Sequence, residues 1–237
     1  MTTEYKSGIT IQNIEPPLAL KDYKLIAFDM DSTILDMETI DDIAEAVGKR
    51  DQVAAITQAS MRGEIKDFKD SLRRRVALLK GVPASVIDDL IADMQLNPGA
   101  ETLIRTLKNA GYKTMLLSGG FTVFTNVLKK RFDFDYTRSN VLEIKEGVLT
   151  GELIPQPWGD ICDGEEKKRC LLNACDELNI KPSQAIAMGD GSNDIPMMSV
   201  AGLSVAYHAK PIVQAQAKIA INEGGLDRLL EVLLPSG

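Results

Sequence analysis

A short apolar run that ends in two acids constrains the fold more than any other part of this chain. It reads Lys24-Leu-Ile-Ala-Phe-Asp-Met-Asp-Ser-Thr-Ile-Leu35, and its apolar part has the composition of a strand buried on both faces. Because side chains alternate along a strand, Asp29 and Asp31 project the same way from its carboxyl end, where open α/β sheets bind ligands. Two carboxylates so close together either raise one pKa or hold a cation. The segment alone is also compatible with an ordinary acidic turn.

A long helical pattern follows this strand. Apolar residues recur at three- and four-residue spacing from residue 37 to residue 95, without a strand pattern between them. We therefore expect residues 37–97 to form a helical cap inserted into a core of residues 22–36 and 98–237. Residues 1–21 are predicted to be an N-terminal extension held only loosely against that core. Three glycine-containing turns divide the cap into four predicted helices: Gly48, Gly63 and Gly81.

Strands and helices alternate in the rest of the chain, as in a parallel sheet with helical crossovers. This pattern predicts an α/β fold class: a doubly wound, mostly parallel, Rossmann-like sheet with an inserted helical-bundle cap and a small β-hairpin over 140–154. The predicted strands cover 112–117, 185–188, 203–206 and 218–221. The predicted helices cover 100–110, 121–131, 164–178 and 225–234, with another from about Asn193.

Composition excludes several classes of partner. The net charge is −7, and no basic run is longer than the three residues of Arg73-Arg74-Arg75, so a nucleic-acid interface is not expected. No apolar run approaches the roughly 20 residues that span a bilayer, so no membrane contact is expected. Three cysteines without metal-type spacing suit a reducing compartment, and we expect a cytoplasmic monomer or homodimer that acts on a small molecule.

Three predicted strands end in polar turns, which a doubly wound sheet brings to one crevice. Besides the first strand, these ends are Ser118-Gly-Gly120 and Gly189-Asp-Gly-Ser-Asn-Asp194. A hydroxyl, close-packed amides and a following helix suit a phosphate, although a structural turn explains Ser-Gly-Gly equally well. Asp190 and Asp194 add carboxylates to the crevice, a donor set that suits Mg²⁺. Lys167 is a candidate cation there, or alternatively an exposed helical lysine.

These ordered motifs resemble those of the haloacid-dehalogenase-like phosphatases, and among them the enzymes that hydrolyse O-phosphoserine. The resemblance covers about residues 22–233. Pro155-Gln-Pro-Trp158 reads as a short insertion within it, with no role implied. Four further segments share the resemblance: Glu38-Thr-Ile-Asp41, Ser71-Leu-Arg-Arg-Arg-Val76, Leu149-Thr-Gly151 and Ala201-Gly-Leu-Ser-Val-Ala-Tyr-His-Ala-Lys-Pro211.

The resemblance implies roles for the residues at the strand ends. Asp29 would be the nucleophile, and Asp31 would be the general acid and base. Mg²⁺ would be held by the Asp29 carboxylate, the backbone carbonyl of Asp31, and Asp190. Asn193 and Asp194 would support the metal site.

The remaining implied residues contact the substrate. Glu38 would bind its ammonium group and Arg75 its carboxylate, although Glu38 could be an ordinary helix-start acid and Arg75 part of a solvated helix face. By the same resemblance, the phosphate would be bound by three residues: Ser118, Gly119 and Lys167. Two apolar residues of the cap would cover the substrate: Met61 and Phe68.

The expected activity is hydrolysis of O-phosphoserine, the final step of serine biosynthesis. Phosphotransfer from phosphoserine to another alcohol, such as homoserine, stays open, as does hydrolysis of a different small phosphomonoester. A phospho-accepting signalling domain is a third possibility. The helical cap and the second acid, Asp31, argue against it, because a switch needs no acid for a leaving group.

Overall fold

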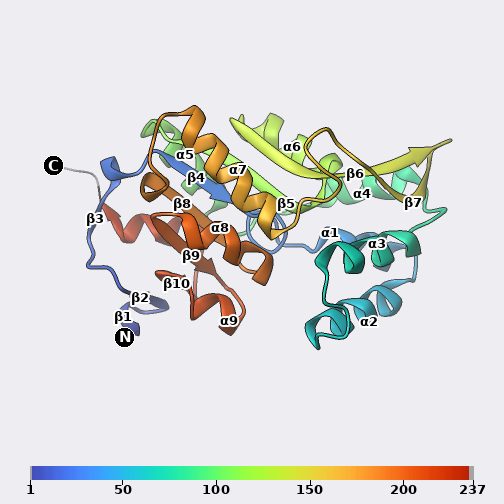
Figure 1. Cartoon of the computed structure of the whole chain (residues 1–237), viewed down its shortest axis with the longest axis horizontal. Helices are drawn as coiled ribbons and strands as arrows, with labels where there is room; N and C mark the ends of the chain where they lie inside the picture. The colour runs from blue at the N-terminus through green and yellow to red at the C-terminus, as the bar shows by residue number, and fades with distance from the viewer. Residues whose placement is uncertain (1, 235–237) are drawn as a thin grey trace.

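The computed structural model describes residues 2–234, apart from the side chain of Met61. Within this part of the chain, nine strands form one sheet in the order β1-β2-β10-β9-β8-β4-β5-β6-β7 (Figure 1). The central strand, β4 (Leu25–Phe28), is the predicted apolar run. The others are β1 (Thr2–Lys6), β2 (Ile9–Gln12), β5 (Lys113–Phe121), β6 (Tyr136–Lys145), β7 (Val148–Ile154), β8 (Ala185–Gly189), β9 (Leu203–Tyr207) and β10 (Ile219–Ile221).

The six strands from β10 to β6 run parallel to one another. β7 returns antiparallel to β6 and makes the predicted hairpin at the sheet edge. The predicted α/β class with a mostly parallel sheet is therefore confirmed. β4 lies between β8 and β5, so the polar residues at the carboxyl ends of these three strands come together at one edge of the sheet. Ser118-Gly-Gly120 belongs to the end of β5, which continues to Phe121, and is not the turn that the sequence predicted after it.

Both faces of β4 are buried because its side chains alternate between two apolar clusters. Ile26 and Phe28 pack in the cluster that contains helices α5 (Ala100–Asn109) and α6 (Thr122–Phe132). Leu25 and Ala27 pack in the second cluster, with α7 (Gly164–Glu177), α8 (Ile195–Val200) and α9 (Pro211–Gln214). Each face of the sheet thus has its own helical layer.

Four helices stand between β4 and α5, as the apolar spacing predicts, and we call this segment the cap. They are α1 (Thr39–Ala46), α2 (Arg50–Met61), α3 (Phe68–Leu78) and α4 (Ala84–Asp93). The first three lie together at one end of the sheet in Figure 1. The turn between α3 and α4 is hydrogen-bonded to the hairpin: Gly81 N donates to Leu149 O, and Leu149 N donates to Val82 O, each at 2.8 Å. Among the described helices, none is long and apolar enough to cross a bilayer.

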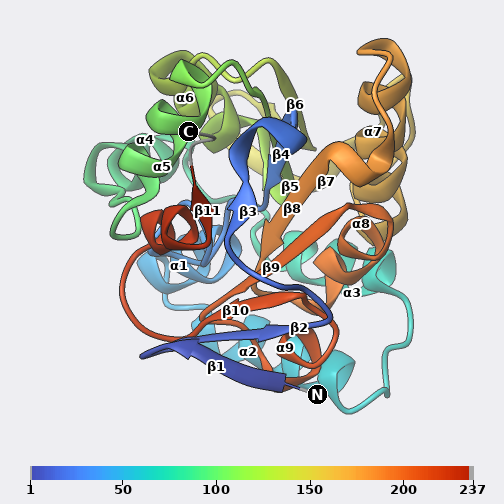
Figure 2. The same cartoon turned by 90° about the vertical axis from the view of Figure 1, so that its left-hand side faces the viewer.

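The two ends of the chain differ from the prediction. The N-terminal segment was expected to be loosely held, but β1 and β2 extend the sheet, with β2 antiparallel to β10 (Figure 2). Ile9 is fully buried there, which explains why the segment is fixed. The closing helix predicted over 225–234 is instead a 3₁₀ segment, Leu226–Glu231, followed by the short strand β11 (Leu233–Leu234), which pairs with β3 (Leu18–Ala19).

Candidate active site

A cavity of about 230 Å³ lies between the strand ends and the cap. Its floor comes from the turns after β4 and β8 and from the end of β5, and its roof comes from α1, α2 and α3. The lining includes most of the residues predicted from the sequence: Asp29, Asp31, Glu38, Phe68, Arg75, Gly119, Asp190 and Asn193.

Asp29 follows β4 directly, and only 4% of its surface is exposed. Its Oδ1 accepts hydrogen bonds from Met30 N and Lys167 Nζ, each at 2.7 Å. Its Oδ2 accepts none from the described residues, so one oxygen is fixed while the other is left free. Burial and the charge of Asp194 raise the pKa of Asp29 well above its usual value, and Lys167 opposes them.

Lys167 is fully buried on α7, which excludes the alternative of an exposed helical lysine. Its Nζ lies 2.7 Å from Asp29 Oδ1 and 2.7 Å from Asp194 Oδ1. Burial alone lowers the pKa of a lysine, but these two carboxylates outweigh it and raise the pKa, so the ammonium stays charged. Asp163 caps α7 by accepting a hydrogen bond from Glu166 N at 2.9 Å, which fixes the helix start near Lys167.

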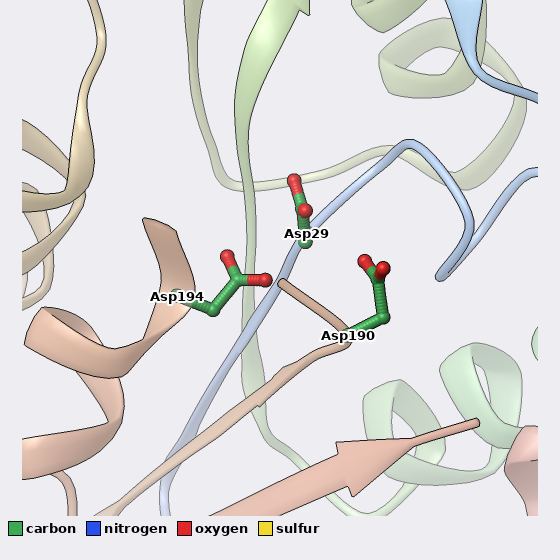
Figure 3. A group of neighbouring side chains, drawn as sticks. All are labelled: Asp29, Asp190 and Asp194. Carbon is green, nitrogen blue, oxygen red and sulfur yellow. The ribbon is translucent and has the colours of Figure 1, made fainter. Parts of the chain in front are cut away.

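Three carboxylates gather at the floor of the site. Asp29, Asp190 and Asp194 each offer an oxygen within 4.8 Å of the others (Figure 3). Both oxygens of Asp194 already accept hydrogen bonds, from Lys167 Nζ at 2.7 Å and from Gly191 N at 3.0 Å. Asp190 has less support: Thr33 Oγ1 donates to its Oδ1 at 3.4 Å, and burial and Asp194 raise its pKa to about 7.

This donor set fits a cation. The carboxylates of Asp29 and Asp190 stay ionised with difficulty, because each is buried and repelled by the others. A divalent ion between their oxygens would remove that repulsion, and an all-oxygen site suits a hard ion. The cluster is therefore able to hold a metal, with Asp194 held behind it by Lys167.

Asp31 has the environment of an acid that keeps its proton. Thr39 Oγ1 donates to its Oδ2 at 3.1 Å, whereas its Oδ1 is buried and has no hydrogen-bond partner among the described residues. Burial, and then the charge of Glu38, raise the pKa of Asp31 to about 8. At neutral pH in the metal-free chain, this carboxyl group can donate a proton into the cavity.

The Ser118-Gly-Gly120 segment packs against Asp31. Ser118 is fully buried and does not line the cavity; its Oγ accepts a hydrogen bond from Gly120 N at 2.8 Å and keeps its own proton for donation. A Cβ atom on Gly120 would lie 2.9 Å from both Asp31 Oδ2 and Thr39 Oγ1. Only glycine lets the segment approach the acid this closely.

The cap supplies the opposite end of the cavity. Arg75 on α3 is half-buried, and in the described chain no carboxylate lies within 4.0 Å of its nitrogens. Burial lowers the pKa of its guanidinium, although an arginine remains charged. Glu38 accepts a hydrogen bond from Ser32 Oγ at 2.6 Å. The Phe68 ring lies over Gly119, and a Cβ atom there would be 3.0 Å from it. The predicted role of Met61 falls on a side chain outside the described structure.

Sequence reasoning missed Lys210, which also lines the cavity. It follows β9, directly before Pro211 at the start of α9, and its backbone N donates to Asp190 O at 3.2 Å. A fourth polar strand end, Tyr207-His-Ala-Lys210, was the available signal. His208, the only histidine, is exposed, bonds Gly224 O at 2.9 Å and does not line this cavity.

Comparison with known proteins gives one consistent relationship. The family model for haloacid dehalogenase-like hydrolases matches residues 23–202. A phosphoserine phosphatase of Polaromonas sp. is 59% identical over 232 residues, 98% of each chain. That of Albidiferax ferrireducens is 57% identical over 98% of this chain and 99% of its own.

Solved structures agree with these sequence relatives. One described as a phospho-aspartyl intermediate analogue of phosphoserine phosphatase has a TM-score of 0.82 and 38% identity, and the match covers 90% of this chain and 99% of that one. The chain therefore belongs to the haloacid dehalogenase-like hydrolases, in the branch formed by the phosphoserine phosphatases.

Proposed function

We propose that this chain hydrolyses O-phosphoserine to serine and inorganic phosphate, the final step of serine biosynthesis. One observation carries the proposal: a single cavity has an oxygen of Asp29 without a hydrogen bond at its floor, and at its roof the guanidinium of Arg75, which bonds only Ser71 O and no carboxylate among the described residues. A phosphorylated amino acid carries a phosphate that can react with Asp29 and a carboxylate that can bind Arg75. The names of the relatives support the same substrate.

Two displacements at phosphorus account for the reaction. Asp29 Oδ2 attacks the phosphorus, the bond from phosphorus to the serine oxygen breaks, and Asp31 gives its proton to that oxygen. Water then attacks the aspartyl-phosphate, Asp31 takes the proton of the water, and Asp29 is released with inorganic phosphate. The raised pKa of Asp31 supports the first of its two roles. The solved phospho-aspartyl analogue of a relative supports the role of Asp29.

Positive charge has to offset the repulsion between Asp29 and a phosphate dianion. We infer that the cation is Mg²⁺, held by Asp29, Asp190 and the backbone carbonyl of Asp31; when bound, it neutralises charge on the phosphate oxygens. Lys167 fixes Asp29 Oδ1 and adds a positive charge behind it. It also donates a hydrogen bond to Asp194 Oδ1, at 2.7 Å, beside the metal ligands.

The phosphate is then bound at the end of β5 by the Ser118-Gly119 segment, of which Gly119 lines the cavity and Ser118 is buried directly behind it. Asn193 and Lys210 also line the cavity. In the cap, Glu38 receives the substrate ammonium group and Arg75 the carboxylate. Phe68 covers the region between them, and Met61 is a candidate for the same cover. We infer that residues 37–97 close over the core when the substrate is bound, which excludes water from the attack.

Product analysis tests this function. Phosphoserine with Mg²⁺ should give serine and inorganic phosphate in equal amounts, faster than other small phosphomonoesters, and the ratio should not change when homoserine is added. Transfer of the phosphate to homoserine would replace the hydrolase with a phosphotransferase. Asp29→Asn should abolish turnover and leave the folded structure intact, because an amide cannot form the acyl-phosphate. Full activity of that variant would overturn the role of Asp29.

A further inference from the structure

The inserted segment Pro155-Gln-Pro-Trp158 begins a loop that touches both the core and the cap. We call residues 155–163 the strap. Its turn is closed by two backbone hydrogen bonds, from Gln156 N to Gly159 O at 2.8 Å and from Gly159 N to Gln156 O at 2.9 Å. The strap therefore has a defined shape, although it lies between β7 and α7 without regular structure of its own.

Trp158 fixes the strap to the core. The guanidinium of Arg138, on β6, lies 4.6 Å from the centre of the Trp158 ring, a cation–π contact. Arg169, on α7, donates to Trp158 O at 2.5 Å. Arg138 is itself held by Glu166 at 3.1 Å, so the anchor is continuous with the helix that carries Lys167.

Asp160, two residues later, points to the cap. Its Oδ1 lies 3.1 Å from Lys69 Nζ, and its Oδ2 pairs with Arg73. Lys69 also lies 3.6 Å from Asp163 Oδ2, the residue that caps α7. The hydrogen bond from Lys69 to Asp160 raises the pKa of the lysine. All of these cations are on the N-terminal half of α3.

The two ends of α3 are held by different forces. Beyond its C-terminal end, the turn that leads to α4 is held by backbone hydrogen bonds to the hairpin: Gly81 N to Leu149 O and Ala84 N to Gly147 O, each at 2.8 Å. The N-terminal end is tied to the strap by partly exposed ion pairs, which are individually weak and screened by salt. Phe68 and Leu72 also pack against the apolar core at this end, so the ion pairs to the strap are the part of its attachment that salt or a single substitution can remove.

We propose that Asp160 is a positioning residue that holds the N-terminal half of α3 on the core, so that Phe68 and Arg75 stay over the cavity. Breaking its pairs lets α3 swing about the backbone bonds at the hairpin and opens the cavity for substrate and product. The consequence for phosphoserine rests on the proposed function. The contact between the strap and α3 is independent of the proposed function.

Hydrogen exchange tests the tie without reference to any substrate. In Asp160→Asn, the amides over 68–75 should exchange about three- to tenfold faster than in the wild type, the range expected for losing a small cluster of partly exposed ion pairs. The hairpin-bonded amides of Gly81, Ala84 and Leu149 should not change. Raising the salt concentration should speed the exchange in the wild type but have little effect in the variant.

Asp70→Asn is the matched control, since Asp70 is on the same helix and pairs with Arg74 at 2.8 Å on the exposed face, away from the strap. It should leave the exchange unchanged. Trp158 is the only tryptophan of the chain, so its emission shows whether the strap itself stays folded in Asp160→Asn. Equal exchange in wild type and variant, or equal acceleration in both variants, would overturn the proposal.

Steady-state kinetics test the consequence for catalysis. Asp160→Asn should raise KM for phosphoserine about three- to tenfold while kcat stays the same or rises, because the cavity opens more often. Asp160→Glu, which keeps the charge, should restore much of the loss. A fall in kcat with KM unchanged would overturn the positioning role. If the wild type does not hydrolyse phosphoserine, the proposed function fails, and the exchange experiment still decides the tie.

Discussion

Removing the guanidinium of Arg75 separates substrate recognition from the phosphate chemistry. The described residues place no carboxylate within 4.0 Å of its nitrogens, so Arg75→Ala breaks no ion pair in the free protein. The loss then comes from the substrate carboxylate. Losing one desolvated partner of a charged contact costs about 2 kcal/mol or more. Since about 1.4 kcal/mol corresponds to tenfold in rate, kcat/KM for phosphoserine should fall about 30-fold or more.

Three substrates make this a test of mechanism. Phosphoethanolamine and p-nitrophenyl phosphate have no carboxylate, so Arg75→Ala should change their kcat/KM little. Arg74→Ala is the control on the neighbouring position, because Arg74 pairs with Asp70 on the exposed helix face and should change kcat/KM by about twofold at most. If Arg75→Ala lowers kcat/KM equally for all three substrates, Arg75 supports the cap and does not bind the carboxylate.

Two further predictions concern the acids of the floor. Asp31→Asn should lower the single-turnover rate of enzyme phosphorylation by phosphoserine about 100-fold or more. The rate with p-nitrophenyl phosphate should fall much less, because nitrophenolate leaves without a proton. Equal losses with the two substrates would refute Asp31 as the acid. The metal-free protein should lose thermal stability as pH rises. The pKa values of Asp190 and Asp31 are raised to about 7 and about 8 in the folded chain, so protons bound between about pH 4 and pH 8 favour the folded state. Adding Mg²⁺ should therefore raise the melting temperature more at pH 8 than at pH 6, as followed by circular dichroism, and an equal increase at both values would contradict this account.

The central part of the fold could be predicted because its signals are local. The apolar run Leu25–Phe28 has the composition of a buried strand, and three strand ends with acids or glycines meet where a parallel sheet makes these strands neighbours. The four cap helices follow from apolar spacing in the same way. The fold class was therefore accessible from the sequence. The candidate residues lie together in one cavity, except those whose side chains are fully buried behind it and Met61, whose side chain is outside the described structure.

The parts that could not be predicted depend on contacts between distant segments. Lys167 lies among other charged residues on its helix, and only Asp29 and Asp194 decide that it is buried. The pair of Lys69 and Asp160 joins positions 91 residues apart. No local pattern in the strap indicates which surface it will face.

The two strands at the start of the chain also affect how the molecule meets other molecules. β10 is a short, buried strand that pairs with β9 on one side, and without β2 its other side would present unpaired amides and carbonyls to a strand of another molecule. β2 occupies that side, and β1 becomes the outermost strand, with the charged and exposed Glu4 and Lys6 on it. The edge strand of the sheet is thus polar β1 and not apolar β10. The bulge between Glu4 and Lys6 also makes β1 a poor template for pairing with a further strand. β1 and β2 therefore protect the sheet from edge-to-edge aggregation at the end opposite the β6–β7 hairpin.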